Sequence, residues 1–143
     1  MKITLDLNVV LDVVQDRAPH YAASAEIMSR ARTGELEAVL PAHAITTIYY
    51  LVARASGRST ADSAVDMLLQ HFDIGPADKG IFQAARRLRF RDFEDSVVAA
   101  IAQASACDYI VTRNVRDFAG SPVSALAPID FLALLPQTQG GQE

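Results

Sequence analysis

The chain has 143 residues, of which 50% are apolar and 21% are charged, and this balance fits one globular domain and excludes a disordered chain. Its formal net charge of −4 argues against bulk, nonspecific binding to nucleic acid, and no apolar run approaches the roughly 20 residues of a membrane span. The single cysteine, Cys107, excludes an internal disulfide and a multi-cysteine zinc site, so a reducing cytoplasm is the compartment we expect.

Short apolar strands and longer helices alternate along the sequence. In chain order we expect a strand over 3–5, helices over 8–15 and 19–33, a strand over 36–40, helices over 42–56 and 59–71, a strand over 72–74, helices over 79–88 and 93–106, a strand over 109–112 and a short helix over 128–134. This alternation favours an α/β fold with a mainly parallel sheet covered on both faces. Residues 1–136 are expected to form one domain, and 137–143 a loose tail.

Particular residues are expected to mark the helix boundaries. Pro19 suits the first turn of a helix, because its missing N–H and fixed φ are harmless there. Ser59, with Asp62 three residues later, is typical of a capping box. Asp78 and Asp92 are expected N-caps, since each carboxylate precedes a helical pattern.

Three groups of polar side chains lie beside strand ends or helix starts. Asp6 follows the first strand, the Asp-Phe-Glu-Asp segment over 92–95 begins a helix, and the Thr-Arg-Asn-Val-Arg-Asp-Phe segment over 112–118 follows a late strand. If the strands over 3–5 and 109–112 are neighbours, the three groups meet at one edge of the sheet. Clustered carboxylates repel each other unless a proton or a cation intervenes, and Mg²⁺ or Mn²⁺ prefers oxygen ligands with retained water. A bound ion there could activate water and stabilise charge on a phosphodiester.

Each of these residues also has a structural interpretation. Asp92 and Asp95 fit the N-cap and N3 positions of a helix, where carboxylates favour the helix dipole. Asp117 fits a turn, and Glu94 fits a solvent-facing position. Asp12, on the second turn of its helix, is expected at the surface or paired with a nearby arginine. Taken singly, such residues are more often structural than catalytic; their ordered combination is more informative.

That combination resembles the PIN domain family, and within it the VapC-like toxins. The matching segments read Leu5-Asp-Leu-Asn-Val-Val-Leu-Asp12, Phe93-Glu-Asp-Ser-Val-Val-Ala-Ala100 and Val111-Thr-Arg-Asn-Val-Arg-Asp-Phe118, and Pro128-Ile-Asp-Phe-Leu132 is similar to the short closing helix. No segment is specific alone, but the three in this order cover nearly the whole chain. The resemblance implies a three-layer α/β/α sandwich and a metal-dependent endoribonuclease, the toxin of a toxin–antitoxin pair.

The same resemblance implies roles for individual residues. The implied metal ligands for Mg²⁺ or Mn²⁺ are Asp6, Asp95 and Asp117, and Glu94 joins them as a catalytic group. Polar side chains expected to support these ligands or to orient water are Asn8, Asp92, Thr112 and Asn114.

Two departures from the family pattern reduce the expected acidity of the site. Many relatives carry a glutamate early in the helix after the second strand, whereas this chain has Thr46 and Thr47 near that position. Asn114 is neutral where an acid is usual, and Glu94 or Asp92 could compensate. The departures leave open an alternative function, that of a catalytically silent PIN-like domain that binds RNA or a protein partner.

A phosphotransfer domain is a third interpretation, because Asp6 also resembles the phosphate acceptor of receiver or haloacid-dehalogenase-like proteins. The latter need a second aspartate two residues later, where this chain has Asn8. Receivers need a lysine near the end of a late strand, and the lysines here are Lys2 and Lys79. We rank this interpretation last.

Basic and apolar surface residues indicate the partners to expect. A local basic patch can hold phosphates even in an acidic protein, although a solvated helix face explains any one arginine equally well. The candidate RNA contacts are Arg86, Arg87, Arg89, Arg91, Arg113 and Arg116. Core packing or a subunit interface explains the apolar run over 45–51 better than base stacking does. The alanine-rich helices of the first half are suited to packing against a second subunit or a partner helix, so we expect a homodimer, and the resemblance implies a cognate antitoxin protein. His20, His43 and His71 have no metal-ligand spacing, and only His43 is expected near the site.

Overall fold

Five strands form one parallel sheet in a computed structural model that describes residues 1–137. Their order across the sheet is β3-β2-β1-β4-β5, so β1 lies at the centre between β2 and β4. The strands are β1 (Lys2–Leu5), β2 (Glu37–Pro41), β3 (Asp73–Gly75), β4 (Tyr109–Val111) and β5 (Ser124–Leu126). The prediction of an α/β fold with a parallel sheet is confirmed, and so is the expectation that the first strand and the strand near 110 are neighbours.

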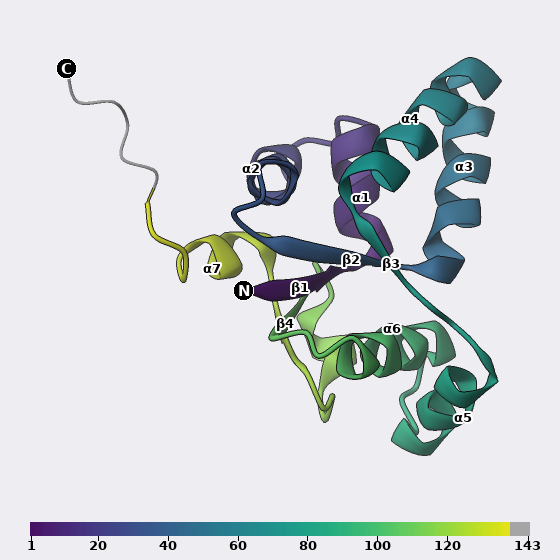
Figure 1. The fold of residues 1–143 in the computed structure, drawn as a ribbon, viewed down its shortest axis with the longest axis vertical. Helices are drawn as coiled ribbons and strands as arrows, with labels where there is room; N and C mark the ends of the chain where they lie inside the picture. Colours follow the sequence, from purple (N-terminus) through teal and green to yellow (C-terminus); the bar gives the residue numbers. More distant parts are fainter. Residues whose placement is uncertain (138–143) are drawn as a thin grey trace.

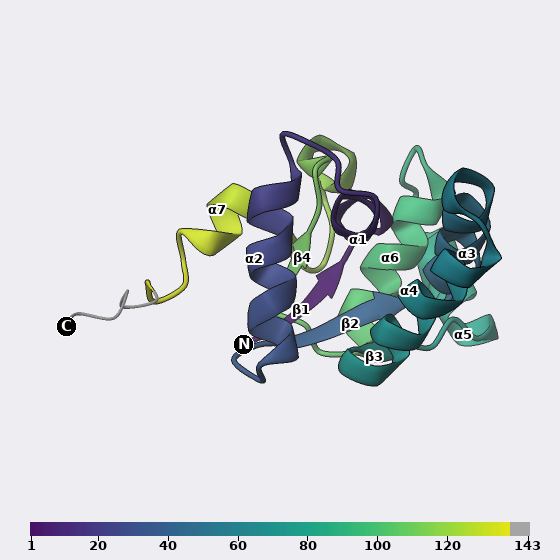
Figure 2. The same cartoon turned by 90° about the horizontal axis from the view of Figure 1, so that it is seen from above.

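Helices cover both faces of the sheet and complete three layers. Figures 1 and 2 show α1, α2, α3, α4 and α7 on one face and α5 and α6 on the other. The helices are α1 (Leu7–Val14), α2 (Tyr21–Arg32), α3 (Ala42–Ser56), α4 (Arg58–His71), α5 (Lys79–Leu88), α6 (Phe93–Ala104) and α7 (Pro128–Leu132), with a 3₁₀ helix η1 (Val115–Phe118) after β4. None of the helices within residues 1–137 is long and apolar enough to cross a membrane.

Strand side chains are buried on both faces, as expected for a parallel sheet with helices on each side. Ile3 and Leu5 of β1 pack in the core beneath α1 to α4, whereas Ile110 of β4 packs in the second core with α5 and α6. Residues 96–102 of α6 are all buried, so this helix is fixed against the sheet along most of its length. The rigid frame therefore holds the starts of α1 and α6 at the same edge of the sheet as the ends of β1 and β4 (Figure 1).

The N-caps expected at Asp78 and Asp92 are confirmed. Asp78 Oδ1 accepts a hydrogen bond from the Ile81 N–H at 3.0 Å, and Asp92 Oδ1 accepts one from the Asp95 N–H at 3.2 Å. These bonds satisfy N–H groups that a helix start otherwise leaves unpaired. Asp92 thus fixes the backbone of Asp95.

Several predicted boundaries are wrong. Pro19 lies before α2 rather than in its first turn, because the helix begins at Tyr21. The cap residue of α4 is Gly57 with φ of 91°, and no side chain caps that helix, so Ser59 does not form a capping box. Strand β5 and helix η1 were not predicted, since Ser124–Leu126 is a three-residue edge strand with little β-propensity. Of the predicted tail, 138–143 lies outside the described residues.

Gly75 ends β3 where the sheet and α6 approach closely. A Cβ built on this residue collides with Ile101 Cγ2 and lies 2.9 Å from Val39 Cγ1. Because both neighbours belong to a packed core, we expect Gly75→Ala to lower the free energy of unfolding by about 1–3 kcal/mol in urea denaturation.

Gly80 is the matched control, because its Cβ meets only Asp78 Oδ1, at 3.4 Å. In helix α5 the change Gly80→Ala should be neutral or stabilising, by up to about 1 kcal/mol. Equal urea midpoints for Gly75→Ala and the unmodified protein would contradict the close approach of β3 and α6.

Candidate functional site at the carboxyl edge of the sheet

Asp6 occupies the first position after the central strand and is tightly held. Its Oδ2 accepts a hydrogen bond from the Thr112 hydroxyl at 2.7 Å, and its Oδ1 accepts one from the Leu7 N–H at 2.8 Å. The Asp6 N–H donates to the Val111 carbonyl at 3.0 Å, which joins the ends of β1 and β4. Asp6 is only 6% exposed, and burial raises the pKa of its carboxyl group, although the Thr112 bond opposes that rise.

Thr112 links Asp6 to the loop that follows β4. Its side chain is fully buried, and its Oγ1 also accepts a hydrogen bond from the Asn114 N–H at 3.0 Å. Asn8 contributes from α1, since its Oδ1 accepts from the Arg113 N–H at 3.5 Å. Thr112 therefore contacts Asp6 directly, while Asn8 and Asn114 hold the loop in place; the side chain of Asn114 is exposed.

Asp95, in the first turn of α6, has an unusual protonation equilibrium. Its pKa is raised to about 7, first by burial and then by the negative charges of Asp92, Asp6, Asp117 and Glu94. Each of these four carboxylates is thus close enough to act on Asp95 electrostatically. The fold brings together acidic residues from the end of β1, the start of α6 and η1, and Asp6 and Asp117 are 111 positions apart in the sequence.

The carboxylates offer the hard oxygen donors that Mg²⁺ and Mn²⁺ prefer. Within residues 1–137 no three His, Cys, Asp or Glu side chains are arranged to hold one metal ion together. Mg²⁺ commonly uses one or two carboxylates and keeps several waters, so a pair of carboxylates is sufficient. After burial, repulsion from the neighbouring carboxylates is the second cause of the raised Asp95 pKa, and a bound cation relieves this repulsion. The donor set therefore fits a hydrated divalent ion held by two carboxylates.

The raised pKa of Asp95 makes stability depend on pH. In the unfolded chain this carboxyl ionises near its ordinary value of 3.8, whereas in the folded protein it stays protonated up to about pH 7. Between these values the folded state binds the additional proton, so this group's contribution to stability falls as pH rises. In EDTA we expect Asp95→Asn to raise the Tm at pH 8 and to leave it nearly unchanged at pH 3.5.

A matched control for that measurement is Asp66→Asn, because Asp66 is an exposed residue of α4. Its Tm difference from the unmodified protein should be equally small at both pH values. A Tm difference for Asp95→Asn that did not change between pH 3.5 and pH 8 would contradict the electrostatic description of the site.

Asp12 lies in the interior, so its expected surface position is wrong and its expected pairing with an arginine is confirmed. Its side chain is fully buried, and its Oδ2 lies 2.7 Å from Arg113 Nε. Arg113 Nη2 also donates to Asp12 Oδ1, at 3.3 Å. This ion pair joins α1 to the loop after β4. It engages the guanidinium of Arg113, a residue that the sequence predicts to contact RNA.

The remaining acidic candidates are exposed. Asp92, Glu94 and Asp117 lie around Asp95, and Asp92 also caps α6. Glu94 Oε1 is 3.7 Å from His43 Nε2, which is beyond hydrogen-bond distance. Thr46 and Thr47 of α3 provide no acid, and both hydroxyls lie 3.4 Å from the His43 carbonyl.

His43 is the residue that sequence reasoning undervalued. Both of its ring nitrogens are buried and have no hydrogen-bond partner among the described residues, and its Nε2 lies 3.7 Å from Glu94 Oε1. The only sequence signal was its position at the start of a helix after a strand. Spacing along the chain could not reveal its neighbours, because they come from α6.

The other candidate RNA contacts are accessible. Arg86 and Arg87 end α5, while Arg89 and Arg91 lie in the connection to α6, and all four are exposed. Arg116 is exposed on η1, one residue from Asp117. Arginines are thus present on two of the elements that border the acidic site.

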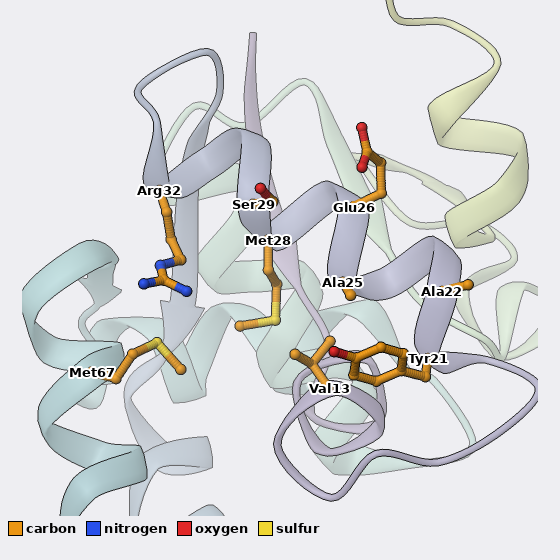
Figure 3. A pocket seen from close by; sticks show the side chains of 9 residues that line it. All are labelled: Val13, Tyr21, Ala22, Ala25, Glu26, Met28, Ser29, Arg32 and Met67. Carbon is orange, nitrogen blue, oxygen red and sulfur yellow. The ribbon is translucent and has the colours of Figure 1, made fainter. Parts of the chain in front are cut away.

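A separate cavity of about 440 Å³ lies among α1, α2 and α4 and contains none of these acidic residues. Figure 3 shows Met28 and Arg32 of α2 directed toward Met67 of α4, with Tyr21 beside Val13. Its lining is mostly apolar. This groove lies on the face of the sheet that α1, α2 and α4 cover, away from the carboxyl edge of the sheet.

The amino-acid sequence matches a family model and a related protein. A profile described as "PIN domain" matches residues 2–116, which is most of the chain. Ribonuclease VapC1 from Aquifex aeolicus is 22% identical over 135 residues, and the alignment covers 91% of this chain and 92% of that protein.

Solved structures of several toxin–antitoxin proteins share the fold. A chain of DNA-bound VapBC from Salmonella typhimurium has a TM-score of 0.70 at 13% identity, with 90% of this chain and 98% of that chain covered. VapBC2 from Rickettsia felis, bound to a promoter DNA fragment, gives 0.68 at 16% identity, covering 89% and 98%. Mycobacterium tuberculosis VapC20, a toxin that cleaves the sarcin–ricin loop, gives 0.62 at 11% identity, covering 76% and 86%.

Proposed function

Because the chain belongs to the PIN domain family, we propose that it is a divalent-metal-dependent endoribonuclease and the toxin of a toxin–antitoxin pair. The observation that carries the proposal is the cluster of carboxylates around Asp95, at the edge where β1 and β4 end; burial and then these neighbouring charges raise the pKa of Asp95 to about 7. Its relative VapC1 is a ribonuclease by name, and the structurally similar VapC20 is described as a toxin that cleaves the sarcin–ricin loop.

Asp6 and Asp95 are the proposed ligands of Mg²⁺ or Mn²⁺, with Asp117 as a third carboxylate. A divalent ion bound there supplies positive charge to the phosphodiester and lowers the pKa of water. Thr112 keeps Asp6 in one orientation through its 2.7 Å hydrogen bond, and the Asp92 cap keeps the start of α6 in place. Glu94 is exposed beside Asp95, and its proposed role is to position the attacking water.

The exposed arginines are the proposed contacts for RNA phosphates. Arg116 is next to Asp117, and the four arginines between 86 and 91 border the start of α6. Local positive charge of this kind can attract a polyanion although the net charge of the chain is −4. Arg113 is not included, because its guanidinium is paired with the buried Asp12.

The proposed protein partners are a cognate antitoxin and a second copy of the chain. The antitoxin proposal is supported by the similar structures, several of which are toxin–antitoxin complexes. The groove in Figure 3 supports it further, because the exposed Tyr21 and the partly exposed Met67 offer apolar surface for a partner segment.

A catalytically silent PIN-like domain is the second candidate function. It is favoured by Thr46 and Thr47 in place of an acid and by the lack of a three-residue metal group within residues 1–137. The phosphotransfer interpretation has less support. Lys2 is at the start of β1, four residues before Asp6 and at the opposite end of the strand, and Lys79 begins α5.

Cleavage of a mixed RNA pool tests the proposal. The purified chain should cleave RNA in Mg²⁺ or Mn²⁺, stop in excess EDTA and resume when the metal is restored. RNA that stays intact under all three conditions, with a folded protein, would favour the silent domain. Cleavage that continues in EDTA would contradict the metal requirement.

A further inference from the structure

A cavity of about 240 Å³ opens beside the acidic site, between the starts of α3 and α6 and the adjoining helix α5. It is lined by His43, Thr47, Phe82, Phe93, Glu94 and Val97. Figure 1 shows the starts of α3 and α6 at the side of the molecule toward which the parallel strands point. The volume is smaller than the roughly 300–1,000 Å³ of drug-sized pockets, so a single planar ring is a suitable occupant. We call this space the Phe82–Phe93 cavity.

Two stacked aromatic rings form one wall of the cavity. The ring centroids of Phe82 and Phe93 are 6.3 Å apart, with an angle of 27° between the planes, and the side chains remain 40% and 44% exposed. This arrangement is an offset stack whose outer faces are still available to a third ring. Covering the exposed phenylalanine rings with an aromatic ligand lowers the free energy of the complex, because apolar surface is removed from water. Every nucleobase has a π face that can cover them.

The opposite side of the cavity carries polar groups with weak partners inside the protein. The Glu94 side chain is 54% exposed and lies 3.7 Å from His43 Nε2, too far for a hydrogen bond. Both His43 nitrogens are buried without a hydrogen-bond partner in the described part of the chain. Burial of unpaired polar atoms costs free energy, and a ligand that supplies a hydrogen bond would recover part of that cost. The Glu94 carboxylate has two acceptor oxygens, so one can accept a hydrogen bond from an N–H group on the edge of a base while the other accepts one from the attacking water.

The cavity also lies next to groups that fit the RNA backbone. Glu94 belongs to both the cavity and the acidic cluster, and it is adjacent to Asp95. Arg86 follows Phe82 by four residues on α5, so the two side chains lie on the same face of the helix, and both are exposed. A ring pair that adjoins the acidic cluster and has an arginine one helical turn away offers contacts for a base and for its neighbouring phosphates.

We propose that the Phe82–Phe93 cavity is a nucleobase subsite, where one unpaired base next to the scissile phosphate stacks on the two phenylalanines and is held at its edge by Glu94. This subsite rests on the proposed ribonuclease function. The base must be unpaired, since a base inside a duplex does not present a free face.

Binding without cleavage provides the test. Short single-stranded RNA oligonucleotides carry 2-aminopurine at successive positions and are titrated with the full chain in EDTA. One position should show strong fluorescence quenching, because 2-aminopurine loses emission when it stacks. Phe82→Leu and Phe93→Leu should weaken binding by about fivefold or more and remove that quenching, whereas Phe82→Tyr retains both.

Leu69→Ala is the control, because Leu69 is an apolar side chain that is 53% exposed on α4, against the other face of the sheet. This variant should bind and quench like the unmodified protein. Circular dichroism and light scattering establish the fold and oligomeric state of each variant.

Three results would overturn the subsite. Equal affinity and quenching in the phenylalanine variants would remove the stacking role. A shift from dimer to monomer in those variants would place the rings at an interface between copies. RNA cleavage that depends on Asp6 but shows no quenched position would reject the subsite alone, whereas RNA that is neither bound nor cleaved would reject the ribonuclease function as well.

Discussion

Asp6→Asn is expected to reduce RNA cleavage at least about 100-fold while leaving the protein folded. Asp6 is the buried carboxylate at the end of the central strand, held by Thr112 and the Leu7 N–H. An asparagine keeps the size and one acceptor oxygen but removes the charge that a divalent ion needs. Because burial raises the pKa of Asp6, replacing it by a neutral group removes an unfavourable charge, and the Tm should not fall substantially.

Asp66→Asn, on the exposed surface of α4, is the control for loss of one negative charge and should cleave normally. Initial rates on one RNA substrate at saturating Mg²⁺ make the comparison. A folded Asp6→Asn protein that cleaves at the unmodified rate would remove Asp6 from the catalytic site.

Arg113→Met is expected to cause the largest loss of stability, about 3 kcal/mol in urea denaturation. In the unmodified protein Arg113 makes two contacts with the fully buried Asp12, at 2.7 and 3.3 Å. The substitution removes both contacts and leaves the Asp12 carboxylate buried without a partner. Breaking a buried ion pair costs about 3–5 kcal/mol, and the lower value applies because the Arg113 side chain is 29% exposed.

The double variant Asp12→Leu with Arg113→Met separates the ion pair from other roles of the arginine. Removing both charges should restore most of the lost stability, since neither partner is left buried alone. If the restored protein also cleaves RNA normally, Arg113 acts through the fold. A single Arg113→Met variant as stable as the unmodified protein would contradict the importance of this pair.

The central fold was predictable because its signals are local. Residues 3–5 and 109–112 form short apolar runs with polar ends, and Asp78 and Asp92 precede helical patterns. In the structure these features become β1, β4 and the caps of α5 and α6. The short edge strand β5 was missed because three residues on the edge of a sheet are specified by their neighbour β4 rather than by their own propensity.

The candidate site was predictable only in part. The position of Asp6, Asp95 and Asp117 beside strand ends or helix starts indicated that these residues would meet, and the electrostatic effects on Asp95 agree with their proximity. The burial of Asp12 was not predicted, since its partner Arg113 is 101 residues away. The cavity beside His43 depends on three helices, and no spacing along the chain encodes it.

A calorimetric titration with Mn²⁺ at pH 8 tests the central claim most directly, with RNA cleavage measured on the same preparations. The proposed site predicts one Mn²⁺ bound by the unmodified protein, and loss of both binding and cleavage in Asp6→Asn and Asp95→Asn. A folded, unmodified protein that neither binds Mn²⁺ nor cleaves RNA would contradict the claim, and the chain would then be a silent PIN domain that acts through its partners.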